Sequence, residues 1–287
     1  MPEKPRNASG YAPGHLELVR STCLYVATKL GDLMDELVVV GGLAPSLLID
    51  QMNLPEGVDS HVGTTDLDVG LTVALLDQQR YATLTERLRR AGFSPDMNED
   101  GNPTRQRWKI EDTAKVTVDF LIQPTLPGDR GGRLRDIEPD FAALIAPGLH
   151  LAFVDRRRVT LSGKTFWEEE ATREVWVCGA GAYIVLKALA FRDRGENKDA
   201  YDLFYLIRNF GVGVSDVADA LCPLMDDPSA VRAAEILEQD FSDHDAVGPR
   251  RVAEFLTGGP DEPLEAFAVG SLDTGAGVQM EEAGGPE

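Results

Sequence analysis

Two aspartates stand one residue apart in a short apolar stretch, "GTTDLDVGL", at residues 63–71. If this stretch is a β-strand, the side chains of Asp66 and Asp68 point to the same face of the sheet, because residues i and i+2 share a face. A second apolar stretch, "KVTVDFL" at 115–121, places Asp119 out of phase with its apolar neighbours and therefore on a polar face. Three converging carboxylates would suit Mg²⁺ or Mn²⁺, which could neutralise triphosphate oxygens and activate a hydroxyl for in-line attack. The alternative is a solvated aspartate pair at the start of a strand.

A glycine pair precedes these acids at the end of another apolar stretch, "VVVGGLAPSLLID" at 38–50. A strand that ends in Gly41 and Gly42 and then opens a helix presents backbone N–H groups at the helix start, where they can bind phosphate. Ser46 falls in the first turn of that helix and brings a hydroxyl close by. A tight strand–helix turn without a ligand is the alternative. The succession of glycine turn, Asp-x-Asp and later strand aspartate favours a functional site.

This succession resembles the nucleotidyltransferase superfamily of the polymerase-β type. A second block, residues 181–209, resembles the C-terminal signature of AbiEii-type and MenT-type toxins, in which a helix carries a lysine, then an arginine, then Lys-Asp-x-x-Asp-Leu. The matching residues are Lys187, Arg192, Lys198, Asp199 and Asp202. The resemblance spans roughly residues 36–210.

The resemblance implies a toxin of a toxin–antitoxin pair that transfers a nucleoside monophosphate from an NTP to an acceptor hydroxyl, with Mg²⁺ (or Mn²⁺) as cofactor. In some relatives the acceptor is a tRNA 3′ end, while others are GTP binders, and the expected protein partner is a cognate antitoxin. The implied site comprises metal ligands Asp66, Asp68 and Asp119, nucleotide-binding residues Gly41, Gly42, Ser46, Thr65 and Lys187, and catalytic residues Asp66, Asp68, Lys187 and Asp202. Within it, Asp202 would orient Lys187 or activate the acceptor hydroxyl.

The residues of the second block agree with a site but allow another interpretation. Lys187 lies on an otherwise apolar helix, so its side chain either extends to solvent or points into a cleft. Asp199 and Asp202 share a helix face, and Lys198 could pair with Asp202. The alternative is a salt-bridged helix pair at the surface. Because helices joined by a short connection tend to pack antiparallel, Lys187 and Asp202 can come together. The shared site that the resemblance implies then predicts that the Lys187 ammonium faces Asp66 and Asp68 across an open cleft.

The chain departs from the family pattern just before Asp-x-Asp, where relatives often carry a basic residue. Here "HVGTT" offers only His61, which as a lone loop histidine is expected to be solvated. A phosphate contact is either missing there or supplied by Arg105, Arg107 or Lys109.

The elements that must position these residues follow from apolar spacing. Helices are predicted over 16–34, 43–51, 77–91, 181–193, 198–209, 214–223, 228–239 and 249–257. Strands are predicted over 37–40, 66–73, 105–111, 115–123, 150–154, 157–162 and 173–178, with a long Pro/Gly-rich loop over 124–147. The expected fold class is α+β, a mixed sheet with flanking helices plus a C-terminal helical bundle. The expected domains are 1–175, 176–257 and a disordered, dispensable acidic tail over 258–287.

Composition limits the function further. The net charge of −20 argues against broad nucleic-acid binding by counterion release, so RNA would have to use local basic clusters. Those clusters are Arg130, Arg133 and Arg135, and residues 156–158; solvated loops or strand edges are the alternative. The first fifteen residues hold no apolar signal-type segment, and no run is long enough to span a membrane. Three scattered cysteines, Cys23, Cys178 and Cys222, indicate reduced thiols, and we expect a cytoplasmic protein without membrane association. An aminoglycoside-type nucleotidyltransferase, which an acidic surface would suit, and a catalytically silent protein that binds a nucleotide or partner are the alternative functions.

Overall fold

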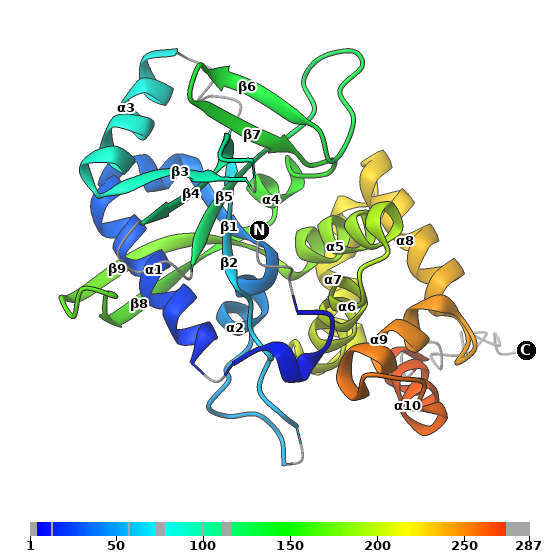
Figure 1. The fold of residues 1–287 in the computed structure, drawn as a ribbon. Helices are drawn as coiled ribbons and strands as arrows, with labels where there is room; N and C mark the ends of the chain where they lie inside the picture. Colours follow the sequence, from blue (N-terminus) through cyan, green and yellow to red (C-terminus); the bar gives the residue numbers. More distant parts are fainter. Residues whose placement is uncertain are drawn as a thin grey trace, which may run out of the picture.

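A computed structural model describes residues 5–12, 14–56, 58–72, 78–98, 100–110 and 116–273. The described residues form one mixed nine-stranded sheet flanked by helices, with a group of helices from the C-terminal third beside it (Figure 1). The strands are β1 (Leu37–Val40), β2 (Asp66–Leu71), β3 (Phe93–Met97), β4 (Pro103–Ile110), β5 (Thr117–Ile122), β6 (Leu134–Glu138), β7 (Phe141–Ile145), β8 (Arg156–Lys164) and β9 (Glu170–Cys178). The predicted fold class, a mixed sheet with flanking helices, is confirmed.

The strand order is β3-β4-β5-β2-β1-β9-β8, and β7 joins β5 with β6 at its outer side. β1 consists of four buried aliphatic residues, as a strand covered on both faces should. It runs antiparallel to β2 and parallel to β9. β2 runs parallel to β5, with Asp68 directly opposite Asp119. The two acidic strands are therefore neighbours at the centre of the sheet.

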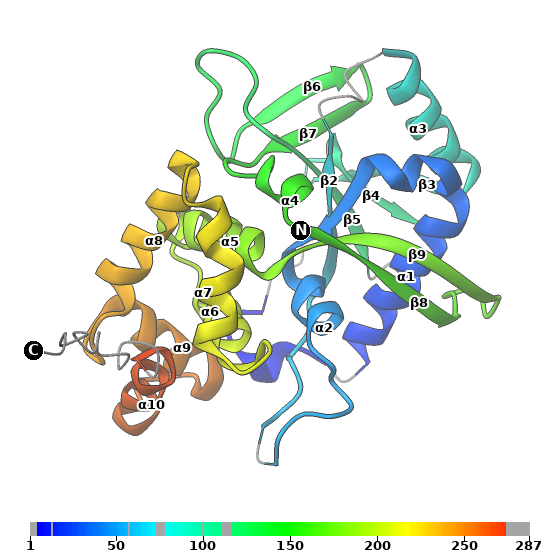
Figure 2. The same ribbon diagram turned by 180° about the vertical axis from the view of Figure 1, so that it is seen from behind.

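The helices are α1 (His15–Leu30), α2 (Ala44–Leu48), α3 (Gln78–Arg90), α4 (Leu151–Val154), α5 (Ala180–Arg194), α6 (Asn197–Asn209), α7 (Val214–Leu221), α8 (Pro228–Phe241), α9 (Val247–Thr257) and α10 (Glu262–Asp273). α1 packs against β8, β9 and α3, while α5 packs against α6, α7 and α8. Figure 2 shows the helices from α5 onward gathered on one side of the sheet, reached directly from the end of β9. None of the described helices is long and apolar enough to cross a membrane.

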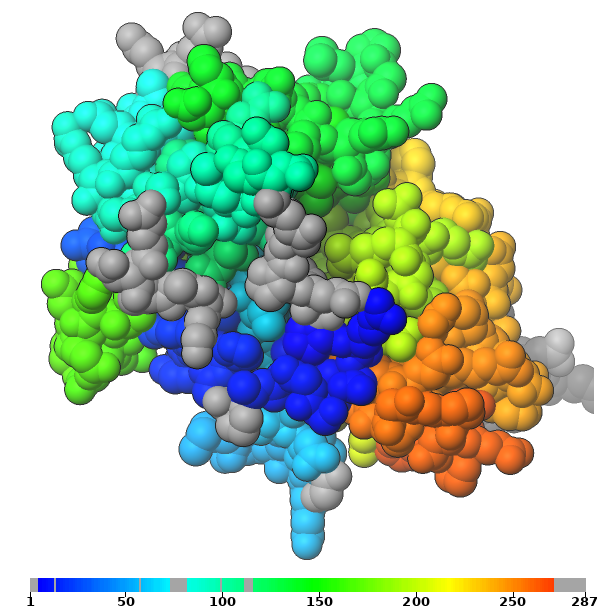
Figure 3. Space-filling model, in the orientation of Figure 1, coloured from blue at the N-terminus to red at the C-terminus, as the bar shows by residue number. Residues whose placement is uncertain are grey.

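The N-terminal segment lies between the two parts of the molecule. Residues Ala8–Gly10 form a short 3₁₀ turn that packs on α9, and the ring of Tyr11 meets Phe255 edge-to-face at 5.8 Å. Figure 3 shows this segment in dark blue against the C-terminal helices in orange. This segment therefore packs on a helix from the C-terminal part of the chain.

Three sequence predictions about the elements were wrong. The stretch 150–154 is the short helix α4 rather than a strand, because a brief apolar run fits either structure. The supposed loop 124–147 contains β6 and β7, whose short strands are masked by the Pro and Gly residues around them. The tail 258–287 contains the helix α10 at Glu262–Asp273. The Gly-rich residues that follow this helix dominate the composition of the tail and led to the prediction of disorder. The remainder of the tail, 274–287, and the turn 111–115 lie outside the described residues.

Candidate active site

Three carboxylates converge on the sheet from two adjacent strands. Asp66 and Asp68 lie on β2 and Asp119 on β5, and one oxygen of each lies within 4.8 Å of the others. Asp66 is only 3 % exposed, and the other two are half-buried. Three carboxylate oxygens at this spacing are the hard donor set that Mg²⁺ or Mn²⁺ prefers. We call these three residues the carboxylate cage.

The glycine turn fits against this cage. Gly41 has φ of +67°, and a Cβ built on it would lie 1.9 Å from Asp68 Oδ2. A Cβ on Gly42 would lie 2.7 Å from the side chain of Thr64, whose hydroxyl donates to Asp66 Oδ1 at 2.8 Å. The glycines therefore give the clearance that allows the carboxylates to approach the end of β1.

Two other predicted nucleotide-binding residues are placed less directly. Ser46 is buried on α2, a helix of five residues, and its hydroxyl donates to the carbonyl of Leu43 at 2.7 Å. That hydroxyl is engaged within its own turn rather than aimed at the carboxylate cage. Thr65 is half-buried in the loop before β2. The nucleotide-binding roles of the glycines, Ser46 and Thr65 stay predictions.

One arginine of β4 reaches the carboxylate cage. Arg107 lies directly opposite Asp119 in the antiparallel β4–β5 pair, and its Nε donates to Asp119 Oδ1 at 2.7 Å. Its hydrogen bond to Asp119 raises the pKa of the Arg107 guanidinium above its ordinary value, despite the opposing effect of burial. Of the other cations proposed for this strand, Arg105 pairs with Asp136 and Lys109 with Asp96.

A second charged cluster is buried between α5 and α6. The Nζ of Lys187 lies 2.9 Å from Asp199 Oδ1 and 2.7 Å from Asp202 Oδ2, and the residue is only 8 % exposed. Lys198 pairs with the other oxygen of Asp202, and Arg194 pairs with Asp199 through Nε at 2.6 Å. Burial alone would raise the pKa of Asp202, but the ammonium groups of Lys187 and Lys198 hold it well below the ordinary value. We call these five residues the helical charge cluster.

His61 contacts the helical charge cluster. It was expected to be solvated, but the structure buries it. It is 3 % exposed, its Nε2 lies 2.9 Å from Asp202 Oδ1, and its Nδ1 accepts from the Gly63 N–H at 3.1 Å. Since Nδ1 accepts, Nε2 carries the proton and donates it to Asp202. Burial, assisted by Lys198, lowers the pKa of His61 to about 4. The ring also stacks on that of Tyr201, with the two centroids 5.3 Å apart, and no local sequence pattern indicated this contact.

The pKa values of Arg194 and Tyr11 are each shifted by carboxylates of both the carboxylate cage and the helical charge cluster. Arg194, missed by the sequence argument, has its pKa raised mainly by its hydrogen bond to Asp199 and also by the charge of Asp68. Tyr11 has its pKa raised by burial first, then by Asp202 and Asp66. Arg192, matched to the family's arginine, instead pairs with Asp240 on α8 at 2.9 Å. Arg194, which ends α5 just before Gly195, is therefore a better candidate than Arg192 for the family's arginine.

The structure brings Lys187 and Asp202 together in the helical charge cluster. Lys187 is enclosed by carboxylates of α6 instead of projecting into open solvent. Its sharing of one cleft with Asp66 and Asp68 stays a prediction, which the joint influence of the two charge groups on Arg194 and Tyr11 supports.

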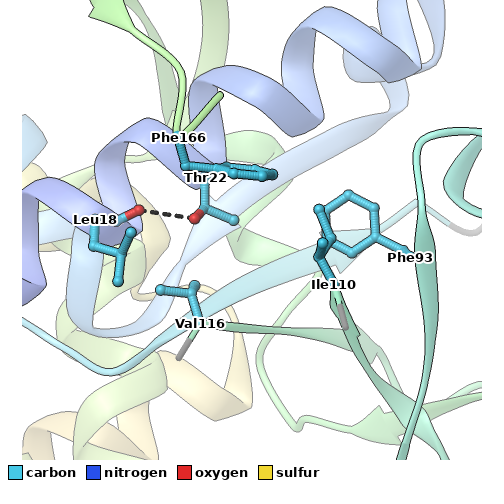
Figure 4. A pocket seen from close by; sticks show the side chains of 6 residues that line it. All are labelled: Leu18, Thr22, Phe93, Ile110, Val116 and Phe166. Atoms are coloured by element: carbon cyan, nitrogen blue, oxygen red, sulfur yellow. Dashed lines mark hydrogen bonds between the residues drawn. The ribbon is translucent and has the colours of Figure 1, made fainter. Parts of the chain in front are cut away.

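A small hollow has a lining that includes no residue of the carboxylate cage or the helical charge cluster (Figure 4). It is lined by Leu18, Thr22, Phe93, Ile110, Val116 and Phe166 and has a volume of about 10 Å³. This is room for about one water molecule. The Thr22 hydroxyl already donates to the Leu18 carbonyl at 2.8 Å, so the hollow offers no site for a nucleotide.

No protein-family model and no curated protein matches this chain. Among solved structures, the chain is similar to the crystal structure of an antigenic nucleotidyltransferase-like protein from Paracoccidioides brasiliensis, with 15 % sequence identity and a TM-score of 0.38. The match covers 76 % of this chain and 93 % of the other. A similarity of this size leaves the assignment of function to the geometry of the site.

Proposed function

We propose that the protein is a Mg²⁺-dependent nucleotidyltransferase that transfers a nucleoside monophosphate from an NTP to an acceptor hydroxyl. The observation that carries the proposal is the carboxylate cage: Asp66, Asp68 and Asp119 within 4.8 Å, closed on one side by Gly41, where any side chain would strike Asp68. Held by Asp66 and Asp68, a divalent ion would neutralise phosphate charge and help to activate the acceptor hydroxyl.

The helical charge cluster supplies the cations that a triphosphate needs. The side chain of Arg194 is 49 % exposed, and the negative charge of Asp68 contributes to raising the pKa of its guanidinium. We therefore assign Arg194 the role of triphosphate ligand. Lys187 and Asp202 are more deeply buried and satisfy each other. Both oxygens of Asp202 already accept hydrogen bonds or ion pairs, from His61, Lys187 and Lys198. This favours orientation of the lysine, rather than activation of the acceptor, as the role of Asp202.

The narrower role follows from the resemblance of the motifs: a toxin of a toxin–antitoxin pair that modifies the 3′ end of tRNA in the cytoplasm. For RNA binding, the guanidinium groups of Arg156 and Arg158 lie over the ring of Trp176, at 4.2 Å and 4.8 Å from its centroid. Arg158 is also paired with Asp35 and Glu174, so its charge is already partly neutralised. A small polycation such as an aminoglycoside is the competing acceptor.

The test incubates the purified protein with Mg²⁺, each of the four α-labelled NTPs, and either total tRNA or an aminoglycoside. We expect label to be incorporated into one acceptor class by the wild type. Asp68→Asn keeps the shape of the side chain but removes a ligand charge, and should reduce the rate by on the order of 10²–10³. Asp219→Asn, on the exposed face of α7, is the matched control and should keep wild-type activity. Transfer by Asp68→Asn at the wild-type rate, or no transfer by the wild type to any acceptor, would refute the proposal.

A further inference from the structure

We infer that Arg107 occupies one cation position of the carboxylate cage, so that the site takes a single divalent ion on Asp66 and Asp68 instead of a pair. The inference rests on the proposed function, since it concerns the metal of the same site. It also identifies Arg107 as a positioning residue that acts through Asp119.

The strand register brings the guanidinium to this position. Across β4 and β5, Arg107 lies opposite Asp119; across β2 and β5, Asp119 lies opposite Asp68. Three neighbouring strands therefore align one cation with the carboxylates at the same level of the sheet. A shift of one residue in the pairing of β4 would turn Arg107 to the other face.

The contacts of Arg107 span the place where a second ion would lie. Its Nε and one terminal nitrogen donate to the two oxygens of Asp119, and the same terminal nitrogen lies 3.9 Å from Asp66 Oδ2. Metal ions in two-metal phosphoryl-transfer sites are about 3.5–4 Å apart. The planar fork of arginine matches a carboxylate at both oxygens, which leaves Asp119 engaged by the guanidinium.

The charges of the carboxylate cage are balanced by one ion. Three carboxylates and the guanidinium leave a net charge that a single divalent ion cancels. A second divalent ion would lie beside the guanidinium of Arg107, and the two positive charges would repel each other in a partly buried site. The side chain of Arg107 is 19 % exposed, so solvent only partly screens that repulsion.

Arg105 offers a matched control on the same strand. It lies two residues from Arg107, but its terminal nitrogen pairs with Asp136 on β6 at 2.9 Å. Its removal takes away a cation of the same strand without removing a contact of the carboxylate cage.

The test counts Mn²⁺ ions bound to the full chain, from the free-Mn²⁺ signal in electron paramagnetic resonance and from calorimetry. Ions still bound by Asp68→Asn are subtracted, so that the exposed group Asp243, His244 and Asp245 does not contribute. We expect one ion in the wild type and in Arg105→Gln. We expect two in Arg107→Gln, with a spectrum broadened by coupling between neighbouring ions, and one in Arg107→Lys, which keeps the positive charge.

Each other outcome is decisive. Two ions in the wild type would overturn the inference while leaving the proposed function intact, and this count holds even if Arg107→Gln does not fold. A single ion in folded Arg107→Gln, or two in Arg107→Lys, would also overturn it. Binding of no ion by the wild type would refute the metal-dependent function itself, and the single-ion site with it.

Discussion

Replacing His61 by glutamine should remove a specific part of the protein's sensitivity to acid. Glutamine can still donate from Nε2 to Asp202 but does not titrate. The pKa of His61 falls from 6.5 to about 4 on folding, chiefly because the ring is buried. Between pH 6.5 and pH 4, His61 therefore takes up a proton in the unfolded chain but not in the folded chain. Stability from this source is complete above pH 6.5 and is lost as the pH falls toward 4.

The size of the effect follows from the two pKa values. At pH 5 the unfolded state has gained almost one proton at His61, and the free energy of unfolding is lower than at pH 8 by about 2 kcal/mol. Asp202 does not interfere, because the stability that its lowered pKa contributes is lost only as the pH falls to the ordinary carboxyl value of 3.8 and below. Contributions that the wild type and the variant share cancel in the comparison.

The assay is urea unfolding followed by circular dichroism at pH 8 and pH 5, for the wild type and His61→Gln. The wild type should lose about 2 kcal/mol more than the variant between the two pH values, at unchanged m-values. If both proteins lose the same amount, His61 is not the buried neutral donor described above, and the argument from its contacts is wrong.

Three further predictions concern the rest of the site and the C-terminal helix. Gly41→Ala should abolish nucleotidyl transfer and lower Tm, because the new Cβ strikes the carboxylate of Asp68 at a backbone angle that favours glycine; activity assays and thermal melts check this. Lys187→Ala leaves two buried carboxylates without their shared cation and should cost about 3–5 kcal/mol in urea unfolding; a loss below about 1 kcal/mol would show that the ion pairs are not buried as described. Truncation before Glu262 removes α10 and its packing, and should lower Tm by several degrees, since each 1 kcal/mol of lost stability corresponds to roughly 2–4 °C. Truncation after Asp273 keeps α10 and is the control. Equal melting temperatures of the two truncated proteins would contradict the packing of α10.

The predictable part of the site was the part contained within single elements. The period of two placed Asp66 and Asp68 together on β2. Similarly, the four-residue spacing on α6 anticipated the pair of Lys198 and Asp202. In each case the partners are separated by a fixed local geometry, which the sequence states directly.

The remaining contacts depend on how elements pair across the chain. Arg107 meets Asp119 only because of the register of β4 and β5, which a one-residue slip would change. His61 meets Asp202, which lies 141 residues later, only once α6 has packed against the loop before β2. Local patterns hold no information about either meeting, and for this reason His61 was expected in solvent and Arg107 was one of three equal candidates.

The pairing of β1 with β9 has a consequence for how the chain is made. β1 ends at Val40, but the strand that covers its other edge spans Glu170–Cys178 and pairs Val39 with Val177. At roughly 5–20 residues per second, the ribosome takes about 7 to 30 seconds to synthesise the intervening chain. During that time one edge of four consecutive aliphatic residues has no partner strand, which is the kind of surface that associates with other chains. A nascent chain, or a fragment that ends before Val177, should therefore depend on chaperones for solubility in a way that the finished protein does not.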